Sequence, residues 1–262
     1  MVRLPMRPVD SLSSFVSAVN RTQKRWGELE LWFRGVKSRR FRLEPSLYRG
    51  RDWKRESTAR VKEDEARIEF SRRAVALYLS PVEPKEFDWY VLMRHSRIAT
   101  RLLDWTEGAL LALYFAVQGS DHPEPGIRRT DAAVWVLDPE WLNEIVTGRR
   151  NNLLTSSAPE LQQYLPEPRQ DRKYGLKPVA VLPRYMNPRM LAQRSVFTIQ
   201  GPRDAFDEFL AKKDKRLVQI IVKRKSCVEI LEQLSLCGID QTTVFPDMDS
   251  LGSDISANFI PS

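Results

Sequence analysis

An arginine stands inside an apolar stretch near the start of the chain, in the middle of the triplet Phe33, Arg34 and Gly35. Its guanidinium offers a fixed fork of donors that suits a phosphate or a carboxylate. The glycine beside it lets a ligand or a neighbouring backbone approach closely. Residues 29–35 predict a strand, so we expect Arg34 at a strand end with its charge directed into a pocket. A structural ion pair for Arg34 is the alternative, and the local sequence favours neither.

A second stretch, residues 100–106 (TRLLDWT), comes directly before an apolar helix. Asp104 or Thr106 can cap that helix, whose free N–H groups could receive a phosphate. Arg101 and Asp104 lie three residues apart, so an ion pair beside a capped core helix is the simpler interpretation. His95, shortly before the stretch, is one of two histidines, and a lone histidine is more often structural than catalytic.

Two further stretches carry polar side chains that suit a binding site. Gln193 and Arg194 precede a short strand. Near the C-terminus, Asp247 and Asp249 could help to hold Mg²⁺, but no full ligand set accompanies them, and a turn before a last helical segment is the alternative. The chain has no phosphate-binding loop, no dinucleotide fingerprint and none of the common zinc-protease or serine-hydrolase motifs.

The elements that must position these residues are helices and strands in irregular alternation. Without a clean βαβ period, their order predicts an α+β fold with a mixed or antiparallel central sheet and flanking helices. Asp10 is expected to cap the first helix. Ser226 and Glu229 form a capping-box pattern before the clearest helix, which Gly238 should end. The polar stretch 148–174 is expected to be a functional or flexible loop. Helices are expected over residues 11–26, 57–80, 87–94, 109–118, 139–147, 188–193, 203–212 and 226–236, and strands over 29–35, 132–137, 178–182, 196–200 and 216–222.

Length and composition are those of an ordinary soluble protein. The 262 residues suffice for one large domain or two small ones, and the 42% apolar and 29% charged residues argue against disorder. The longest uninterrupted apolar run is nine residues, 109–117, whereas a membrane span needs about 20. The N-terminus has no apolar signal segment, and Cys227 and Cys237 form neither a disulfide framework nor a metal-ligand pattern. A cytoplasmic location is therefore expected.

The positive charge of the chain is concentrated in one segment. The net charge is +8, and residues 21–60 hold 13 Lys and Arg against five Asp and Glu. This basic block suggests an anionic partner, either a nucleotide, a nucleic acid or an acidic protein, although a solvated basic face without a partner is equally consistent. Aromatic residues interleave with the charges and would allow stacking on nucleic-acid bases. They are Trp26, Trp32, Phe41, Tyr48 and Trp53.

Several motifs follow one another in an order that resembles the FRG domain family, which takes its name from the triplet at Arg34. They are the triplet itself, PSLYR at 45–49, TRLLDWT at 100–106, ALYFA at 112–116, Val134 and Trp135 before LDP at 137–139, Gln193 before Phe197 and Thr198, and FPD at 245–247. The resemblance runs from about residue 26 to about residue 255. It implies a single FRG domain within residues 1–262, preceded by a helical extension at about 10–26.

The segment before TRLLDWT departs from the family pattern, which commonly reads QHYGLPTRLLDWT. Arg94 stands where glutamine is usual, and Ser96, Arg97 and Ala99 replace tyrosine, glycine and proline. This turn is therefore more basic than in the family and less pre-bent. If it lines the site, its ligand preference is expected to differ.

A strand that ends in Tyr/Phe-Arg-Gly is also similar to the first strand of arginine-type ADP-ribosyltransferases. This resemblance implies an ADP-ribosyltransferase-like core in which Arg34 holds NAD through its phosphates and nicotinamide ribose. Thr100 or Thr106 would support the pocket.

The catalytic glutamate of such enzymes has no counterpart in this sequence. It would fall at Val196, and valine cannot bond the ribose or steady an oxocarbenium-like transition state. Asp104, Glu107 or another acid would have to take its place.

The sequence therefore predicts a nucleotide-binding protein, with NAD as substrate, that transfers ADP-ribose or hydrolyses NAD in a toxin or phage-defence setting. A nucleic acid or a protein would be the acceptor, an antitoxin or partner chain would accompany it, and no membrane is involved. Two rival hypotheses remain, namely a nucleic-acid-binding or nuclease module and a non-catalytic interaction domain of a larger complex. The expected catalytic residues are Arg34, Asp104 and Gln193. The expected ligand-binding residues are Phe33, Gly35, Arg49, His95, Thr100, Arg101, Thr106 and Tyr114, and no metal ligands are expected.

Overall fold

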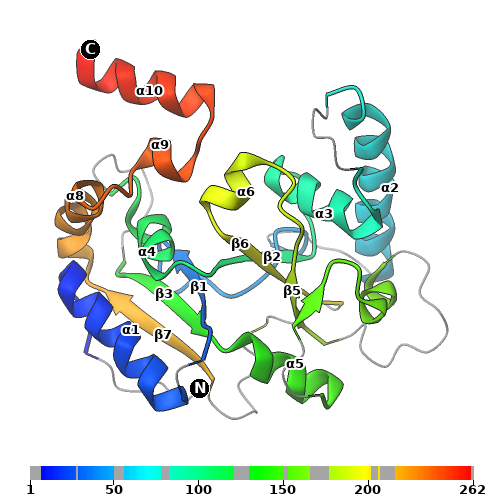
Figure 1. The fold of residues 1–262 in the computed structure, drawn as a ribbon, viewed down its shortest axis with the longest axis horizontal. Helices are drawn as coiled ribbons and strands as arrows, with labels where there is room; N and C mark the ends of the chain where they lie inside the picture. The colour runs from blue at the N-terminus through cyan, green and yellow to red at the C-terminus, as the bar shows by residue number, and fades with distance from the viewer. Residues whose placement is uncertain are drawn as a thin grey trace.

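A mixed β-sheet forms the centre of the computed structural model, which describes residues 7–27, 29–49, 56–77, 83–120, 130–149, 153–165, 177–201, 206 and 216–260. The seven strands of this described part are β1 (Trp32–Val36), β2 (Leu102–Thr106), β3 (Ala132–Leu137), β4 (Leu154–Thr155), β5 (Val179–Leu182), β6 (Ser195–Ile199) and β7 (Leu217–Val222). They lie in the order β4-β5-β6-β2-β1-β3-β7, and all neighbours are antiparallel except β4 and β5 (Figure 1). The expected α+β fold with a mixed central sheet is confirmed.

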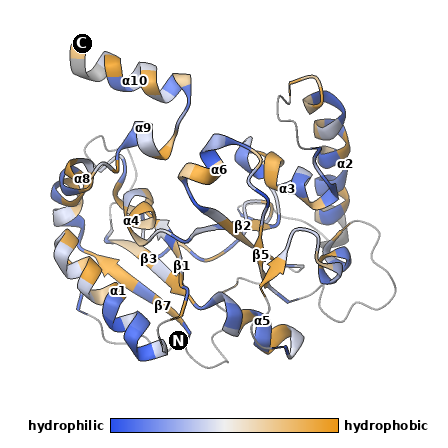
Figure 2. Cartoon of the chain, viewed as in Figure 1, coloured by the Kyte–Doolittle hydropathy of each residue, from blue (hydrophilic) through white to orange (hydrophobic). Residues whose placement is uncertain are grey.

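Helices surround this sheet (Figure 1). They are α1 (Leu12–Trp26), α2 (Glu56–Ala74), α3 (Glu86–His95), α4 (Ala109–Val117), α5 (Pro139–Thr147), α6 (Pro188–Ala192), α8 (Cys227–Leu236), α9 (Gln241–Val244) and α10 (Met248–Phe259), with the 3₁₀ helices η1 (Pro159–Tyr164) and η2 (Arg224–Ser226). Figure 2 shows that the strands are largely apolar, whereas α2 is mainly polar.

Two hydrophobic cores lie on opposite faces of the sheet, because successive residues of a strand point to opposite sides. Along β3, Trp135 and Leu137 belong to a core that α3 and α5 complete, whereas Val134 belongs to one that α1, α4 and α8 complete. Phe15 and Ala18 of α1 are fully buried in this second core. The N-terminal helix therefore packs into the fold.

The sheet is nearly divided between β1 and β2. These two strands pair only at Phe33 and Thr106, whereas β1 pairs along its whole length with β3, and β2 along its whole length with β6. A continued antiparallel ladder would place Gly35 opposite Asp104, but the strands have separated there. Two well-paired halves of the sheet therefore meet at one point, and polar side chains can enter the gap between them.

The stretch TRLLDWT forms strand β2, although we expected it to be the entrance to a helix. Asp104 lies in the middle of β2, and the residue that caps α4 is Gly108, without a side-chain hydrogen bond. The expected capping by Asp104 is therefore wrong. Thr106 comes closer to the expectation, because its hydroxyl accepts a hydrogen bond from the Gly108 amide at 3.0 Å. Aspartate is unfavourable inside a strand, and for this reason the sequence did not predict β2.

Two of the expected helix caps are also wrong. Ser11 caps α1 by accepting a bond from the amide three residues further along, while Asp10 pairs with Lys223 at 2.7 Å. Ser226 stands at the N-cap position of α8, where it also ends η2, but its side chain makes no capping bond. Gly238 follows α8 in the left-handed conformation that ends helices, as expected.

Strand β3 and helix α5 have the same bounds that the sequence predicts. Asp138 accepts a hydrogen bond from the Trp141 amide, Pro139 is the first helical residue, and Gly148 ends the helix in the left-handed conformation. These are the usual start and stop signals of a helix. Local sequence alone therefore suffices for this part of the fold.

Other expected elements fall partly or wholly outside the described residues. The expected helix over 203–212 does so except for Phe206, which is buried. The described part of the expected loop 148–174 contains β4 and η1. None of the described helices has the length and apolar character that a membrane span requires.

Candidate functional site

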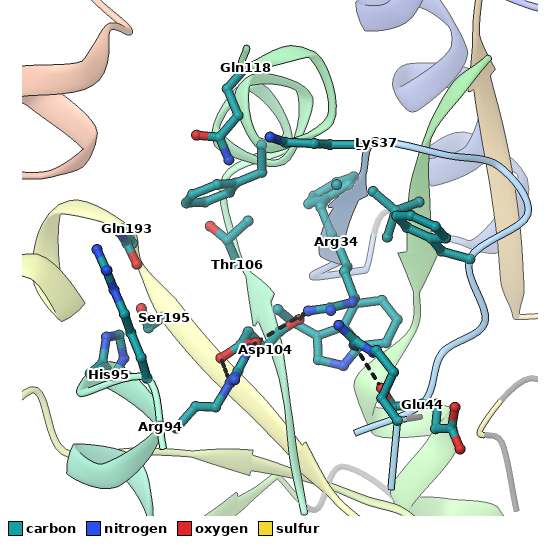
Figure 3. A pocket seen from close by; sticks show the side chains of 18 of the residues that line it. Arg34, Lys37, Glu44, Arg94, His95, Asp104, Thr106, Gln118, Gln193 and Ser195 are labelled. Carbon is teal, nitrogen blue, oxygen red and sulfur yellow. Dashed lines mark hydrogen bonds and ion pairs between the residues drawn. The ribbon is translucent and has the colours of Figure 1, made fainter. Parts of the chain in front are cut away.

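A cavity of about 780 Å³ opens where β1 and β2 separate. Its walls come from β1 and the loop after it, from β2, from α3 and the turn that follows it, and from the segment that joins α6 to β6 (Figure 3). Among the described residues, eight that line it are cationic and two are acidic. This excess of positive charge suits an anionic ligand. The cationic residues are Arg34, Lys37, Arg40, Arg42, Arg49, Arg94, Arg97 and Arg189, and the acidic ones are Glu44 and Asp104.

Arg34 enters the cavity from the middle of β1 and reaches across the gap to β2 (Figure 3). Its Nη1 donates a hydrogen bond to the main-chain oxygen of Asp104 at 2.6 Å and lies 3.4 Å from the Asp104 Oδ2. Only 14% of the Arg34 side chain is exposed, and burial lowers the pKa of Arg34 to about 10, which leaves it charged at neutral pH. Its Nε is buried without a hydrogen-bond partner among the described residues. A buried donor of this kind is a local cost to the fold within the described residues.

Asp104 is held by a second arginine, Arg94, in the last turn of α3. The Arg94 Nε and Nη2 donate to both carboxylate oxygens of Asp104 at 2.6–3.0 Å. Burial opposes charge on Asp104, yet the charge and hydrogen bonds of Arg94, together with the charge of Arg34, hold the pKa of Asp104 well below its usual range. Asp104 is therefore an anion that orients two arginines, and its carboxylate is poorly suited to accept a proton.

Gly35 allows a helix to approach the sheet. A Cβ atom at this position would lie 1.9 Å from the main-chain oxygen of Ala112 and 2.7 Å from the amide nitrogen of Ala116, both in α4. Helix α4 can therefore lie against β1 only because residue 35 has no side chain. Phe33 belongs to the core that contains α4, and both it and Gly35 also reach the cavity lining.

The turn after α3 brings Arg97 to the cavity in a strained conformation. Its φ is 66°, in the left-handed region that favours glycine. Glycine is the residue that the FRG pattern commonly has at this position, and the backbone conformation explains the preference. In this chain a side chain that carries positive charge stands there and lines the cavity.

His95 and Gln193 form a wall on the other side of Asp104 from Arg34 (Figure 3). Burial lowers the pKa of His95 to about 4, so its ring is neutral at pH 7, and its Nε2 is buried without a hydrogen-bond partner among the described residues. Gln193 donates to the main-chain oxygen of Val244 at 3.1 Å, which ties the end of α6 to α9. The side-chain amide nitrogen of Gln193 therefore already makes a hydrogen bond within the protein.

Eight of the eleven expected site residues line the cavity. Thr100 and Tyr114 do not, since the Thr100 hydroxyl accepts a bond from the Leu102 amide and Tyr114 packs in the second core. The eight are Phe33, Arg34, Gly35, Arg49, His95, Asp104, Thr106 and Gln193.

Arg101 is the third expected residue that lies elsewhere. It is almost fully buried in an ion pair with Glu63 of α2, and it also donates to the main-chain oxygen of Tyr164. The expected pair between Arg101 and Asp104 is therefore wrong. Residues three apart in extended backbone point to opposite sides, so the two charges cannot meet.

Several cavity residues were not singled out from the sequence. The basic block indicated positive charge at Lys37, Arg40 and Arg42, but it did not indicate that these side chains would face a cavity. Arg189 and Ser195 had no signal at all, because only the folded chain brings α6 and β6 beside β2.

The other acids considered from the sequence do not line the cavity. Glu107 lies 3.6 Å from Arg194 in an ion pair. The position of the missing glutamate is taken by Val196, which is buried in β6. Asp247 caps α10 by accepting a bond from the Ser250 amide at 2.8 Å. Within the described residues, no three or more His, Cys, Asp or Glu side chains gather in a way that could hold a metal ion.

Most aromatic residues of the basic block are not available for stacking. Trp26, Trp32 and Tyr48 are buried, and Trp53 lies outside the described residues. Phe41 is 56% exposed and lines the cavity between two arginines.

Comparison with protein-family models matches residues 29–124 to the FRG domain. The matched segment contains β1 and β2, the two strands that separate at the cavity, while β3, β4, β5, β6 and β7 of the described sheet lie outside it. Comparisons with curated proteins and with solved structures gave no match. An ADP-ribosyltransferase-like core therefore stays a prediction.

Proposed function

This chain carries an FRG domain, and we propose that the cavity between β1 and β2 of that domain binds a nucleotide, with NAD as the ligand to test first. The observation that carries the proposal is the cavity lining, in which the described residues include eight cationic side chains and two acidic ones. Guanidinium groups bind phosphate oxygens through paired N–H donors, so this lining suits a nucleotide diphosphate. Arg34 reaches the cavity from β1 with 14% of its side chain exposed.

The size and the aromatic lining of the cavity support a nucleotide rather than a bare anion. Its volume of about 780 Å³ falls in the range of about 300–1,000 Å³ that small-molecule sites occupy. Aromatic rings in the lining offer faces or edges for a base or a nicotinamide ring. They are Phe33, Phe41, Trp105, Phe115 and Phe245.

If NAD is cleaved here, the bond between the nicotinamide nitrogen and the ribose breaks, neutral nicotinamide leaves with the electron pair, and positive charge develops on the ribose. Water, or a nucleophile on the acceptor, then bonds the ribose carbon and gives up its proton to solvent. A carboxylate that faces the ribose would stabilise this charge. Asp104 is already bound by Arg94 and Arg34, so its proposed role is to orient them. Glu44, the other described acid in the lining, is the group that we propose to face the ribose.

The test is incubation of the purified chain with NAD, followed by measurement of nicotinamide release and of NAD affinity. Arg34→Ala should lower NAD affinity at least about tenfold, whereas Glu44→Gln should keep binding and abolish release. Arg72→Gln removes a charge from α2, outside the cavity lining, and serves as the matched control. Absence of NAD binding to the unaltered chain would overturn the proposal. Binding without release would leave the nucleotide site in place and favour the non-catalytic role.

A toxin or phage-defence setting belongs to the same proposal and has its own test. A chain that consumes NAD should arrest the growth of bacteria that express it, and Arg34→Ala and Glu44→Gln should restore growth at equal protein levels. Arrest that persists in both variants would separate toxicity from the cavity.

A nucleic-acid partner is a second candidate, which one observation favours. Phe41 is exposed at the cavity between Arg40 and Arg42, an arrangement that combines a stacking ring with phosphate contacts. Binding of a fluorescent single-stranded oligonucleotide that falls steeply with salt and weakens in Phe41→Ala would support it.

A further inference from the structure

A second group of cationic and polar side chains lines the cavity, separate from Arg34. Arg97 comes from the turn after α3, Arg189 from α6 and His95 from the end of α3. His95 lies on the other side of Asp104 from Arg34 (Figure 3). The carboxylate of Asp104 therefore stands between His95 and Arg34.

An aromatic ring holds the guanidinium of Arg189 in place. Its guanidinium lies over the ring of Phe245, 4.6 Å from the centroid, and Gln193 ties the neighbouring residue Val244 to the end of α6. The Arg189 Nε is buried and has no hydrogen-bond partner among the described residues. Burial, and after it the charge of Arg97, lower the pKa of Arg189, although Asp247 acts in the opposite direction. The side chain is thus half-buried and held over a ring, and the charges of Asp247 and Asp104 compensate its own in part.

Arg97 adds a second charge at some cost to the backbone. A φ of 66° is a conformation that side chains other than that of glycine rarely adopt. The charge of Arg97 also acts against that of Arg189. Asp247 interacts with both charges, and a phosphate that the two arginines share would offset more of their repulsion.

His95 completes the group as a neutral partner. Its Nε2 is buried without a partner among the described residues, and its ring packs edge-on against Phe197 at 5.9 Å between centroids. An imidazole N–H fixed in this way can donate to a phosphate oxygen without adding charge.

We propose that Arg97, Arg189 and His95 form a second phosphate subsite, which takes a terminal phosphate monoester of the nucleotide. A monoester carries close to two negative charges and three acceptor oxygens, which match two guanidinium groups and one imidazole. Because Asp104 stands between His95 and Arg34, the two subsites are proposed to take separate phosphate groups rather than one diphosphate. The ligand class is therefore a nucleotide with an additional phosphate apart from its diphosphate, such as a 2′- or 3′-phosphorylated one. This inference rests on the proposed function of the same cavity.

The experiment compares affinities for NADP and NAD by isothermal titration, with adenosine 3′,5′-bisphosphate against AMP to distinguish a 2′-phosphate from a 3′-phosphate. Inorganic phosphate is titrated alone. We expect the favoured phosphorylated ligand to bind at least about tenfold tighter than its unphosphorylated counterpart. Arg97→Gly removes the charge while giving the backbone the residue that its φ favours, so the variant should be as stable as the unaltered chain or more so. Arg189→Gln is the second variant, and Arg72→Gln is the control.

In Arg97→Gly and Arg189→Gln the preference should fall to within about twofold, while affinity for NAD changes by less than about threefold. Equal binding of NADP and NAD, together with equal binding of the bisphosphate and AMP, would overturn the second subsite and leave the proposed function standing. A preference that survives in both variants would also overturn it. Absence of binding by every nucleotide would overturn the proposed function itself.

Discussion

Arg34 donates a hydrogen bond to the main-chain oxygen of Asp104 at 2.6 Å, at the level where β1 and β2 have already separated. A continued ladder would have placed Gly35 opposite Asp104, so a side chain here takes over a bond that the backbone no longer makes. The same side chain also lines the cavity. One arginine therefore helps to hold the sheet together where it opens and also presents a donor to whatever enters.

Asp104→Asn should lower the free energy of unfolding by about 2 kcal/mol, because it leaves Arg94 and Arg34 close together without their shared anion. This is less than the loss of about 3–5 kcal/mol expected for a fully buried pair, since 36% of the Asp104 side chain is exposed. Urea unfolding gives the value. A double-mutant cycle with Arg94→Gln should show a coupling energy of about 1 kcal/mol or more. Simple additivity of the two substitutions would contradict the pairing.

Gly35→Ala should destabilise the protein by about 3 kcal/mol or more, because the new Cβ would meet main-chain atoms of α4, which cannot rotate away. Gly252→Ala is the matched control. Its Cβ meets nothing within 4 Å inside α10, so a gain of about 0.5–1 kcal/mol is expected. Thermal unfolding of both variants measures the contrast. Equal effects in the two variants would show that α4 does not depend on Gly35.

Arg101→Met should cost about 3–5 kcal/mol, because it leaves Glu63 charged and buried. The double variant Arg101→Met/Glu63→Leu should recover part of this loss, since the removal of both charges also removes their desolvation. Its nucleotide affinity should match that of the unaltered chain, because Arg101 lies outside the cavity lining. If the double variant folds but loses nucleotide affinity, the placement of Arg101 outside the binding site is contradicted.

His95 should make stability depend on pH between about 4 and 6.5. Its folded pKa of about 4 lies below the value of about 6.5 expected in the unfolded chain. The unfolded state therefore binds the extra proton in this window, and stability falls as the pH is lowered through it. Burial is the main cause, and the groups that act on His95 are Asp104, which favours its charge, and Arg189 and Arg94, which oppose it.

The check is the slope of the unfolding free energy against pH, which one such proton can change by at most about 1.4 kcal/mol per pH unit. His95→Gln should flatten the slope between pH 5 and 6.5, where most carboxylates remain ionised. If the slope is the same in His95→Gln, the imidazole ring of His95 is exposed to water in the folded state and its pKa is not lowered by burial.

The sequence predicted the elements whose signals are local. Asp138, Pro139 and Gly148 mark α5 by their own chemistry, and the apolar run before them can only be a buried strand. Strand β2 was missed because Asp104 contradicts strand propensity, and only Arg34 and Arg94, far away along the chain, make the aspartate acceptable there.

The candidate site was predictable to a similar extent. Arg34 could be singled out because a charge in an apolar strand needs an explanation. The wrong pairing of Arg101 with Asp104 came from a helix-like spacing applied to extended backbone. Arg189 could not be predicted as a site residue, because nothing in the neighbouring sequence indicates that α6 lies beside the cavity.

The single point of pairing between β1 and β2 also affects how the molecule moves. Two halves of a sheet joined at Phe33 and Thr106 can open and close as separate cooperative units. A ligand that engages Arg34 on one half and the α3 and α6 side chains on the other would clamp them together. Amide hydrogen exchange in β1 and β2 should then slow together when a ligand fills the cavity. The exchange rates of these two strands would therefore report whether the site is occupied.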